Sequence, residues 1–142
     1  MEKKKGKVLV LDDERIVLES VSRILEEEDY EVKTAQSGDE AVNLLKGGGF
    51  DVLITDLKMP GMNGLQAMEA LLDVDPDLSM IMATAYSTVD SAVKAMKLGA
   101  VDYIRKPFTP DQLVELVNNV MEDRKGCFEK RYRADTFEDL KN

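Results

Sequence analysis

Short apolar runs alternate with segments of helical periodicity along most of the chain. Five runs have the length and composition of β-strands: residues 7–11, 31–34, 51–55, 78–83 and 101–105. Segments with apolar residues at helical spacing lie between or after them, at 14–28, 37–46, 65–73, 88–98 and from 110 onward. This alternation predicts an α/β fold, a five-stranded parallel sheet with five helices distributed over both of its faces.

Several elements carry the residues that usually begin them. Ser37, with Glu40 three residues later, predicts a capping box at the start of a helix. Thr109 before Pro110 predicts the start of the last helix, because proline is favoured at the first helical position. The run at 31–34 is brief and polar, so we expect it to form an edge strand.

Charged side chains follow three of the strands at the point where each strand ends. Asp12 and Asp13 follow the first run. Asp56 follows the third run, and Lys106 follows the fifth. Because the carboxyl ends of parallel strands lie at one edge of the sheet, we expect three carboxylates and one ammonium to converge there. Neighbouring carboxylates repel one another, and a hard divalent cation such as Mg²⁺ suits an all-oxygen site, so the pattern predicts a magnesium-binding pocket.

Charge and composition exclude several classes of function. The net charge is -9, with 28 acidic and 19 basic residues, which argues against direct nucleic-acid binding by this segment. Histidine is absent from the sequence, so no histidine of this chain can be a metal ligand, a general base or a phosphoryl carrier. The single cysteine, Cys127, excludes an intrachain disulfide.

Length and hydropathy predict a single domain in the cytoplasm. The chain has 142 residues, 44% of them apolar, which is enough for one domain with a real core. No apolar run reaches the roughly 18 residues of a transmembrane helix, and the N-terminus lacks the apolar segment of a signal peptide. We therefore expect no membrane partner, a domain over 1–122, and a linker or tail over 123–142.

Four motifs, in this order and at strand ends, resemble the receiver domain of two-component response regulators. They are residues 8–14 (VLVLDDE), 56–64 (DLKMPGMNG), 83–86 (ATAY) and 103–108 (YIRKPF). The resemblance covers about residues 6–122 and implies a flavodoxin-like (βα)5 fold. Asn63 stands where the family often has aspartate, at a loop position that is not a metal ligand.

The resemblance implies roles for the acidic residues. Asp56 would be the phosphoacceptor, since a carboxylate oxygen is a competent nucleophile towards phosphorus. Asp13 and Asp56 would bind Mg²⁺ directly, together with the backbone carbonyl of Lys58. Asp12 would act on the ion mainly through a water molecule.

Other residues of the resemblance would bind the phosphoryl group or respond to it. Thr84 and Lys106 would bind its oxygens. Thr84 and Tyr103 would form the switch pair, in which Tyr103 moves inwards as Thr84 moves towards the phosphoryl group. The resemblance also assigns the tuning of dephosphorylation to Lys58 and Tyr86, and a cis peptide bond to Lys106 and Pro107.

The implied function is a phosphorylation-controlled switch rather than an enzyme that turns over an outside substrate. A sensor histidine kinase would phosphorylate Asp56, and the face of residues 88–125 would change its affinity for an output domain or a protein partner. Residues 83–100 resemble the receivers of transcription activators that use the alternative sigma factor of nitrogen regulation. A stand-alone receiver is the main alternative, and a homodimer through the last helices is compatible with either form.

Three other functional classes fit the sequence less well. An aspartate-nucleophile phosphatase usually has two aspartates separated by one residue after the first strand, whereas Asp12 and Asp13 are adjacent. A phosphate-independent docking module would not need the site residues, all of which are present. A flavin carrier would need backbone donors and hydroxyls in the first loop, where this chain has acids.

Overall fold

The computed structural model of the chain describes residues 4–56, 64–85, 93, 96, 97 and 99–123. Its strands are β1 (Gly6–Leu11), β2 (Tyr30–Ala35), β3 (Val52–Thr55), β4 (Ser79–Thr84) and β5 (Ala100–Arg105). Its labelled helices are α1 (Arg15–Glu27), α2 (Gly38–Lys46) and α3 (Gly64–Val74). Residues 110–123 form a further helix, which we call the last helix.

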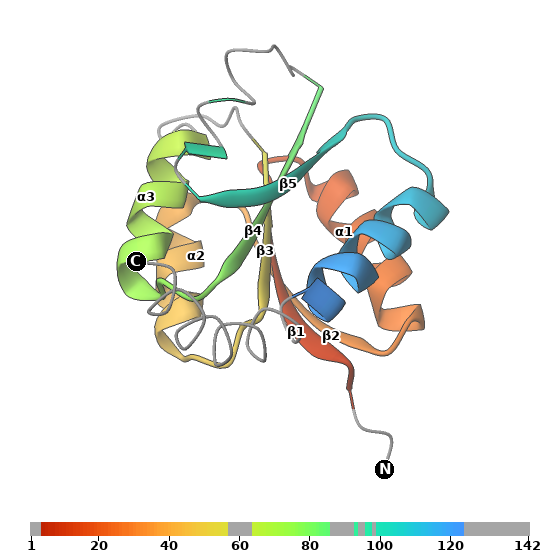
Figure 1. Ribbon diagram of the computed structural model, residues 1–142, viewed down its shortest axis with the longest axis horizontal. Helices are drawn as coiled ribbons and strands as arrows, with labels where there is room; N and C mark the ends of the chain where they lie inside the picture. Colours follow the sequence, from red (N-terminus) through yellow and green to blue (C-terminus); the bar gives the residue numbers. More distant parts are fainter. Residues whose placement is uncertain (1–3, 57–63, 86–92, 94–95, 98, 124–142) are drawn as a thin grey trace, which may run out of the picture.

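The five strands form one parallel sheet in the order β2-β1-β3-β4-β5 (Figure 1). The predicted parallel sheet is therefore confirmed, and β2 is an edge strand as expected. Leu11, at the end of β1, lies opposite Ala35 of β2 and Thr55 of β3. Because the ends of β1 and β3 lie side by side, the residues that follow them start from neighbouring positions.

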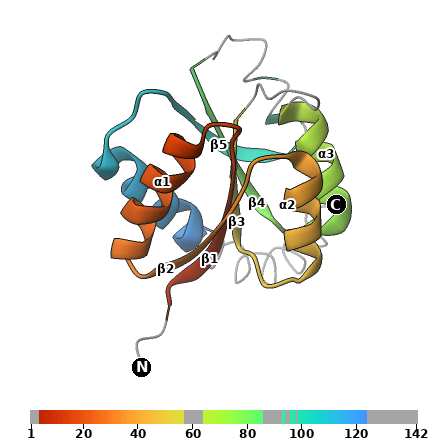
Figure 2. The same ribbon diagram turned by 180° about the vertical axis from the view of Figure 1, so that it is seen from behind.

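Helices cover both faces of the sheet (Figures 1 and 2). The α1 helix and the last helix lie on one face, and α2 and α3 lie on the other. Each face has its own apolar cluster; Val10, Ile54 and Val117 belong to the first, and Leu9, Leu53 and Leu71 to the second. Both faces of the central strands are thus buried, which explains why β1 and β3 read as continuous apolar runs.

Four of the five predicted helices lie within the described part of the chain. The remaining one was expected over 88–98, where residues 93, 96 and 97 are helical and the others lie outside the described residues. Val93 and Met96, which belong to this segment, are 44% and 48% exposed. Within the described residues, no helix is both long and apolar enough to cross a lipid bilayer.

Two helix starts are held by the side chains that the sequence predicts. The N–H of Glu40 donates to Ser37 Oγ at 3.2 Å, but the Glu40 carboxylate accepts from the N–H of Gln36 rather than from that of Ser37. At the last helix, the N–H of Gln112 donates to Thr109 Oγ1 and the N–H of Thr109 donates to Gln112 Oε1. This second pair is a reciprocal capping box that fixes where the last helix begins.

Candidate functional site

Three predicted site residues extend the hydrogen-bond ladders of the strands that they follow. The N–H of Asp12 donates to the carbonyl of Ala35 (3.1 Å), that of Asp56 to Leu11 (3.2 Å), and that of Lys106 to Thr84 (3.0 Å). Each residue is therefore tied to the strand next to its own. The three side chains start from fixed points at the carboxyl edge of the sheet, at the top of Figure 1.

The ammonium of Lys106 bridges two carboxylates. Its Nζ lies 2.6 Å from Asp12 Oδ2 and 2.7 Å from Asp56 Oδ2, distances typical of charge-assisted hydrogen bonds. The side chains are 3% exposed for Asp12, 9% for Asp56 and 14% for Lys106, so solvent screens these pairs weakly. Two carboxylates this close and this buried would repel each other strongly without a shared cation, which Lys106 supplies.

Burial and hydrogen bonding act in opposite directions on these groups. Burial raises the pKa of Asp12, and the hydrogen bonds from Lys106 and from the N–H of Glu14 partly offset that effect. For Lys106, burial alone would lower the pKa, but the hydrogen bonds to Asp12 and Asp56 outweigh it and raise the pKa. The ammonium therefore stays charged at neutral pH, and both oxygens of Asp12 have partners within the protein.

Asp13 completes an acidic cluster that is open on one side. It is exposed, whereas Asp12 and Asp56 are buried, and one carboxylate oxygen from each of the three lies within 4.8 Å of the others. Oxygen ligands on opposite sides of a Mg²⁺ ion are about 4.2 Å apart, so small side-chain movements would place these oxygens around one. Three carboxylates and one ammonium leave two negative charges, which a divalent cation would balance. The donor set fits a hard cation such as Mg²⁺.

The predicted switch residues, Thr84 and Tyr103, lie on the neighbouring strands β4 and β5. Thr84 ends β4; its side chain is buried and its carbonyl holds the backbone of Lys106. Tyr103 lies opposite Met82 in the β4–β5 register and is 45% exposed. It lines an open groove of about 850 Å³ between β5 and the last helix, with Lys106 and Pro107 at the same groove.

The remaining predictions concern one peptide bond and the two residues that were expected to tune dephosphorylation. The peptide bond between Lys106 and Pro107 is cis. Lys58 and Tyr86 lie outside the described residues.

Two contacts of the site had no counterpart among the sequence predictions. The bond between Lys106 and Asp12 joins residues 94 positions apart, and the predicted role of Lys106 was to bind the phosphoryl oxygens. Thr55, which is fully buried, donates from Oγ1 to the carbonyl of Asp56 at 3.2 Å. Their only signal in the sequence is that each residue lies at a strand end.

Comparisons with known proteins agree on one family over most of the chain. The family described as "Response regulator receiver domain" matches residues 8–118. The alginate biosynthesis transcriptional regulatory protein AlgB of Pseudomonas aeruginosa is 42% identical over 110 residues, which are 78% of this chain and 24% of AlgB. The C4-dicarboxylate transport transcriptional regulatory protein DctD of Rhizobium meliloti is 36% identical over 124 residues, 87% of this chain and 27% of DctD. The chain spans about a quarter of the length of these curated relatives.

Solved structures give the same result for the fold. A CheY-like receiver domain protein from Methanospirillum hungatei has a TM-score of 0.82 at 30% identity, covering 85% of this chain and 97% of that one. The beryllofluoride-activated NtrC4 receiver domain dimer has a TM-score of 0.78 at 36% identity, covering 83% and 98%. The flavodoxin-like receiver fold and the resemblance to nitrogen-regulation-type receivers are thereby confirmed.

Proposed function

The chain belongs to the response regulator receiver domain family of two-component signalling, and on that premise we propose that it is a phosphorylation-controlled switch with Asp56 as the phosphoacceptor. The proposal rests on one observation, that Asp56 lies in a buried acidic cluster with the Lys106 ammonium 2.7 Å from its carboxylate. A carboxylate so placed has a cation beside it to offset the charge of an incoming phosphoryl group.

The transfer step forms one bond and breaks one. A carboxylate oxygen of Asp56 bonds to phosphorus while the bond from phosphorus to a histidine nitrogen of the donor breaks, and that nitrogen keeps the electron pair. A sensor histidine kinase would be the donor, because the chain belongs to the response regulator receiver domain family. The chain promotes its own phosphorylation and dephosphorylation and turns over no outside substrate.

The acidic cluster would hold Mg²⁺ during transfer. Asp13 and Asp56 would bind it directly with the backbone carbonyl of Lys58, and Asp12 through a water molecule. When bound, the ion would offset negative charge on the phosphoryl oxygens. The exposure of Asp13 and the protein partners already held by both oxygens of Asp12 support this division of roles.

The phosphoryl group would then bias the conformation of the site. It adds about two negative charges and strong acceptor oxygens. The hydroxyl of Thr84 and the ammonium of Lys106 would donate to these oxygens, and Tyr103 would turn inwards as Thr84 moves. Such a change needs two conformations whose populations phosphorylation shifts. Lys58 and Tyr86 would set how fast water removes the group.

The affected surface would be the face of residues 88–125, including a fifth helix over 88–98. Among the described residues of this face, four large apolar side chains are 44–48% exposed: Val93, Met96, Val101 and Tyr103. Because the relatives AlgB and DctD are transcriptional regulators, we place the switch in the cytoplasm, where it would control transcription through an output domain or a protein partner. A homodimer through this face is compatible with that role. The alternative is a stand-alone receiver or a phosphate-independent docking module.

Intact-mass spectrometry tests the phosphoacceptor. The protein is incubated with Mg²⁺ and a small acyl phosphate, and we expect one added phosphoryl group. Asp56→Asn should abolish the gain. Asp51→Asn is the matched control, because Asp51 lies at the opposite end of β3, where its carboxylate accepts from the N–H of Lys7. A full gain of mass in Asp56→Asn, or the same loss in both variants, would reject the proposal.

A further inference from the structure

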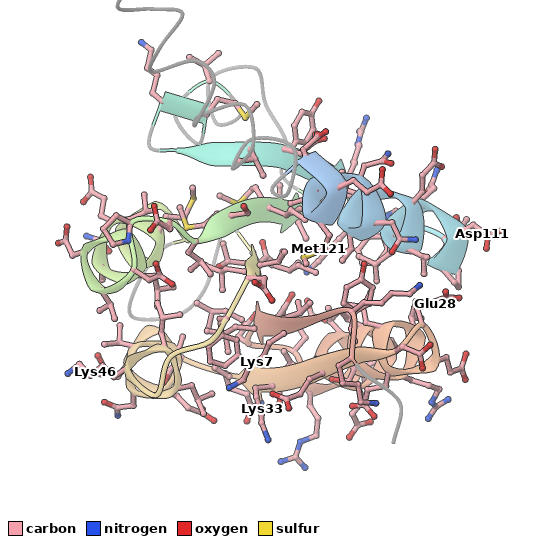
Figure 3. All side chains as sticks on the ribbon, turned by 60° about the horizontal axis from the view of Figure 1, so that its bottom comes forward. Lys7, Glu28, Lys33, Lys46, Asp111 and Met121 are labelled. Carbon is pink, nitrogen blue, oxygen red and sulfur yellow. The ribbon has the colours of Figure 1, made fainter. Side chains whose placement is uncertain are left out.

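Thr55 is a polar side chain among apolar neighbours. It is the last residue of β3 and is fully buried. In the register of the sheet it lies between Leu11 of β1 and Met82 of β4, which both belong to the apolar cluster on the α2–α3 face. Successive side chains of a strand point to opposite faces, so Thr55, like Leu53, faces the layer of α2 and α3, at the left of Figure 3. The Thr55 hydroxyl is therefore shielded from water.

Packing alone does not explain a threonine at this position. Valine has the same shape, and a buried hydroxyl costs free energy unless it forms a hydrogen bond. The Thr55 hydroxyl forms one, because its Oγ1 donates to the carbonyl of Asp56 at 3.2 Å. The hydroxyl is thus explained by the group that it holds, which is the backbone of Asp56.

The backbone of Asp56 is held on both sides of its Cα atom. Its N–H donates to the carbonyl of Leu11 at 3.2 Å, and its own carbonyl accepts from Thr55. The first bond orients the peptide group before the Cα atom, and the second orients the peptide group after it. Because the backbone of a residue rotates only about the two bonds of its Cα atom, these contacts together fix the direction of the Asp56 Cβ atom.

The direction of the Asp56 side chain matters for the reaction. Its Oδ2 lies 2.7 Å from Lys106 Nζ, and the side chain is almost completely enclosed. Aspartate has a single methylene group, so a rotation of its backbone moves the carboxylate oxygens directly. A misplacement of about 1 Å at a reacting group can slow a reaction by roughly a hundredfold. A contact that holds the Asp56 backbone can therefore affect the rate of phosphoryl transfer.

We propose that Thr55 is a positioning residue for phosphoryl transfer, whose hydroxyl holds the carbonyl of Asp56 and keeps the Asp56 carboxylate aimed at the Lys106 ammonium. The inference rests on the proposed function, in which Asp56 is the phosphoacceptor. Thr55 acts through Asp56 and is not itself a reacting group. Without its hydroxyl, the peptide group after Asp56 loses a restraint, and the carboxylate spends less time in the reactive position.

Two substitutions of Thr55 separate positioning from packing. Thr55→Val keeps the shape of the side chain and removes the hydroxyl. Thr55→Ser keeps the hydroxyl and removes a methyl group from the apolar cluster, so it should unfold at a lower urea concentration than wild type. Thr34→Val is the matched control, because it makes the same substitution at a half-buried position of β2, next to Lys33, which Figure 3 labels.

The rate of phosphorylation is measured on the whole chain. Each protein is incubated with a small acyl phosphate at saturating Mg²⁺, and the gain of one phosphoryl group is followed over time by intact-mass spectrometry. Urea denaturation of the same proteins verifies that each is folded under the conditions of the reaction. The rate is then compared with the stability of each variant.

The expected rates follow the hydroxyl and not the stability. Thr55→Val should be phosphorylated roughly tenfold more slowly than wild type, whereas Thr55→Ser and Thr34→Val should match wild type. A purely structural role would instead make the less stable Thr55→Ser the slower protein. A Thr55→Val protein as fast as wild type, or a Thr55→Ser protein as slow as Thr55→Val, would overturn the inference. Wild type that gains no phosphoryl group would overturn the proposed function itself, so the two failures are distinguishable.

Discussion

The Lys106 ammonium lies 2.7 Å from Asp56 Oδ2, although 50 positions separate the two residues in sequence. The same nitrogen lies 2.6 Å from Asp12 Oδ2. One side chain after β5 therefore joins the residues that follow β1 and β3. The positive charge of Lys106 therefore acts on both buried carboxylates.

Removing the cation should destabilise the fold when no divalent metal is present. We expect Lys106→Gln to lower the free energy of unfolding by about 1–3 kcal/mol, because two buried carboxylates lose their shared partner. Urea denaturation with a chelator measures this. Lys33→Gln, at an exposed position of β2, should change stability by no more than about 0.5 kcal/mol. Equal stability of Lys106→Gln and wild type would contradict the role given to Lys106.

Asp13 should matter for metal binding and little for stability. We expect Asp13→Asn to raise the dissociation constant for Mg²⁺ by roughly tenfold or more, a scale reached even by residues that support metal ligands indirectly. The exposed side chain should leave the free energy of unfolding nearly unchanged. Titration calorimetry compares it with Asp39→Asn, an exposed acid in the first turn of α2. Equal Mg²⁺ affinity of both variants would exclude Asp13 as a ligand.

Tyr30 should make stability depend on pH in the alkaline range. Burial and the nearby charge of Glu28 raise the pKa of Tyr30 above its ordinary value near 10, so the folded state favours the neutral phenol. The stabilisation that Tyr30 contributes is complete at pH values below its pKa in the unfolded chain. It is lost as the pH rises through the higher pKa of Tyr30 in the folded state.

The comparison of wild type with Tyr30→Phe isolates this effect. At neutral pH the variant should be less stable by about 0.5–1.5 kcal/mol, because the hydrogen bond to Asn118 is lost. Above pH 10 the difference in the free energy of unfolding should shrink. Deprotonation of Tyr30 then favours the unfolded state of the wild type, whereas the variant has no phenol at this position. Urea denaturation at pH 7 and at rising alkaline pH checks both points. A difference that stays constant would mean that Tyr30 titrates alike in both states.

Ser37 should stabilise α2 as its N-cap. We expect Ser37→Ala to cost about 1 kcal/mol, because the N–H of Glu40 loses its acceptor. Ser20→Ala, at an exposed position inside α1, should be neutral or slightly stabilising, since alanine is the better helix former. If the two variants unfold at the same urea concentration, the cap contributes nothing.

Much of the fold follows from sequence because each element has a single dominant pattern. The runs that became β1 and β3 are apolar on both faces, as strands buried between two helix layers must be. Ser37 and Thr109 mark helix starts by local hydrogen bonds, which act within a few residues. The α1 helix begins at Arg15 rather than at the predicted residue 14, because Glu14 has an extended backbone and is the N-cap.

The candidate site was predictable in outline and not in its contacts. A parallel sheet brings the residues after β1, β3 and β5 to one edge, so the convergence of Asp12, Asp56 and Lys106 follows from topology. The contact between the ammonium of Lys106 and Asp12 depends on side-chain packing between residues 94 positions apart. No local sequence pattern predicts such a contact. The contact of Tyr30 with Asn118 was missed for the same reason.

The position of the phosphoryl group tests the central claim most directly. The protein is phosphorylated with a small acyl phosphate and Mg²⁺, reduced with borohydride to convert an aspartyl phosphate to homoserine, and digested for peptide mass spectrometry. The account predicts homoserine at position 56, and none when Mg²⁺ is left out. Homoserine at position 12 or 13, or phosphate on a residue outside the acidic cluster, would contradict it.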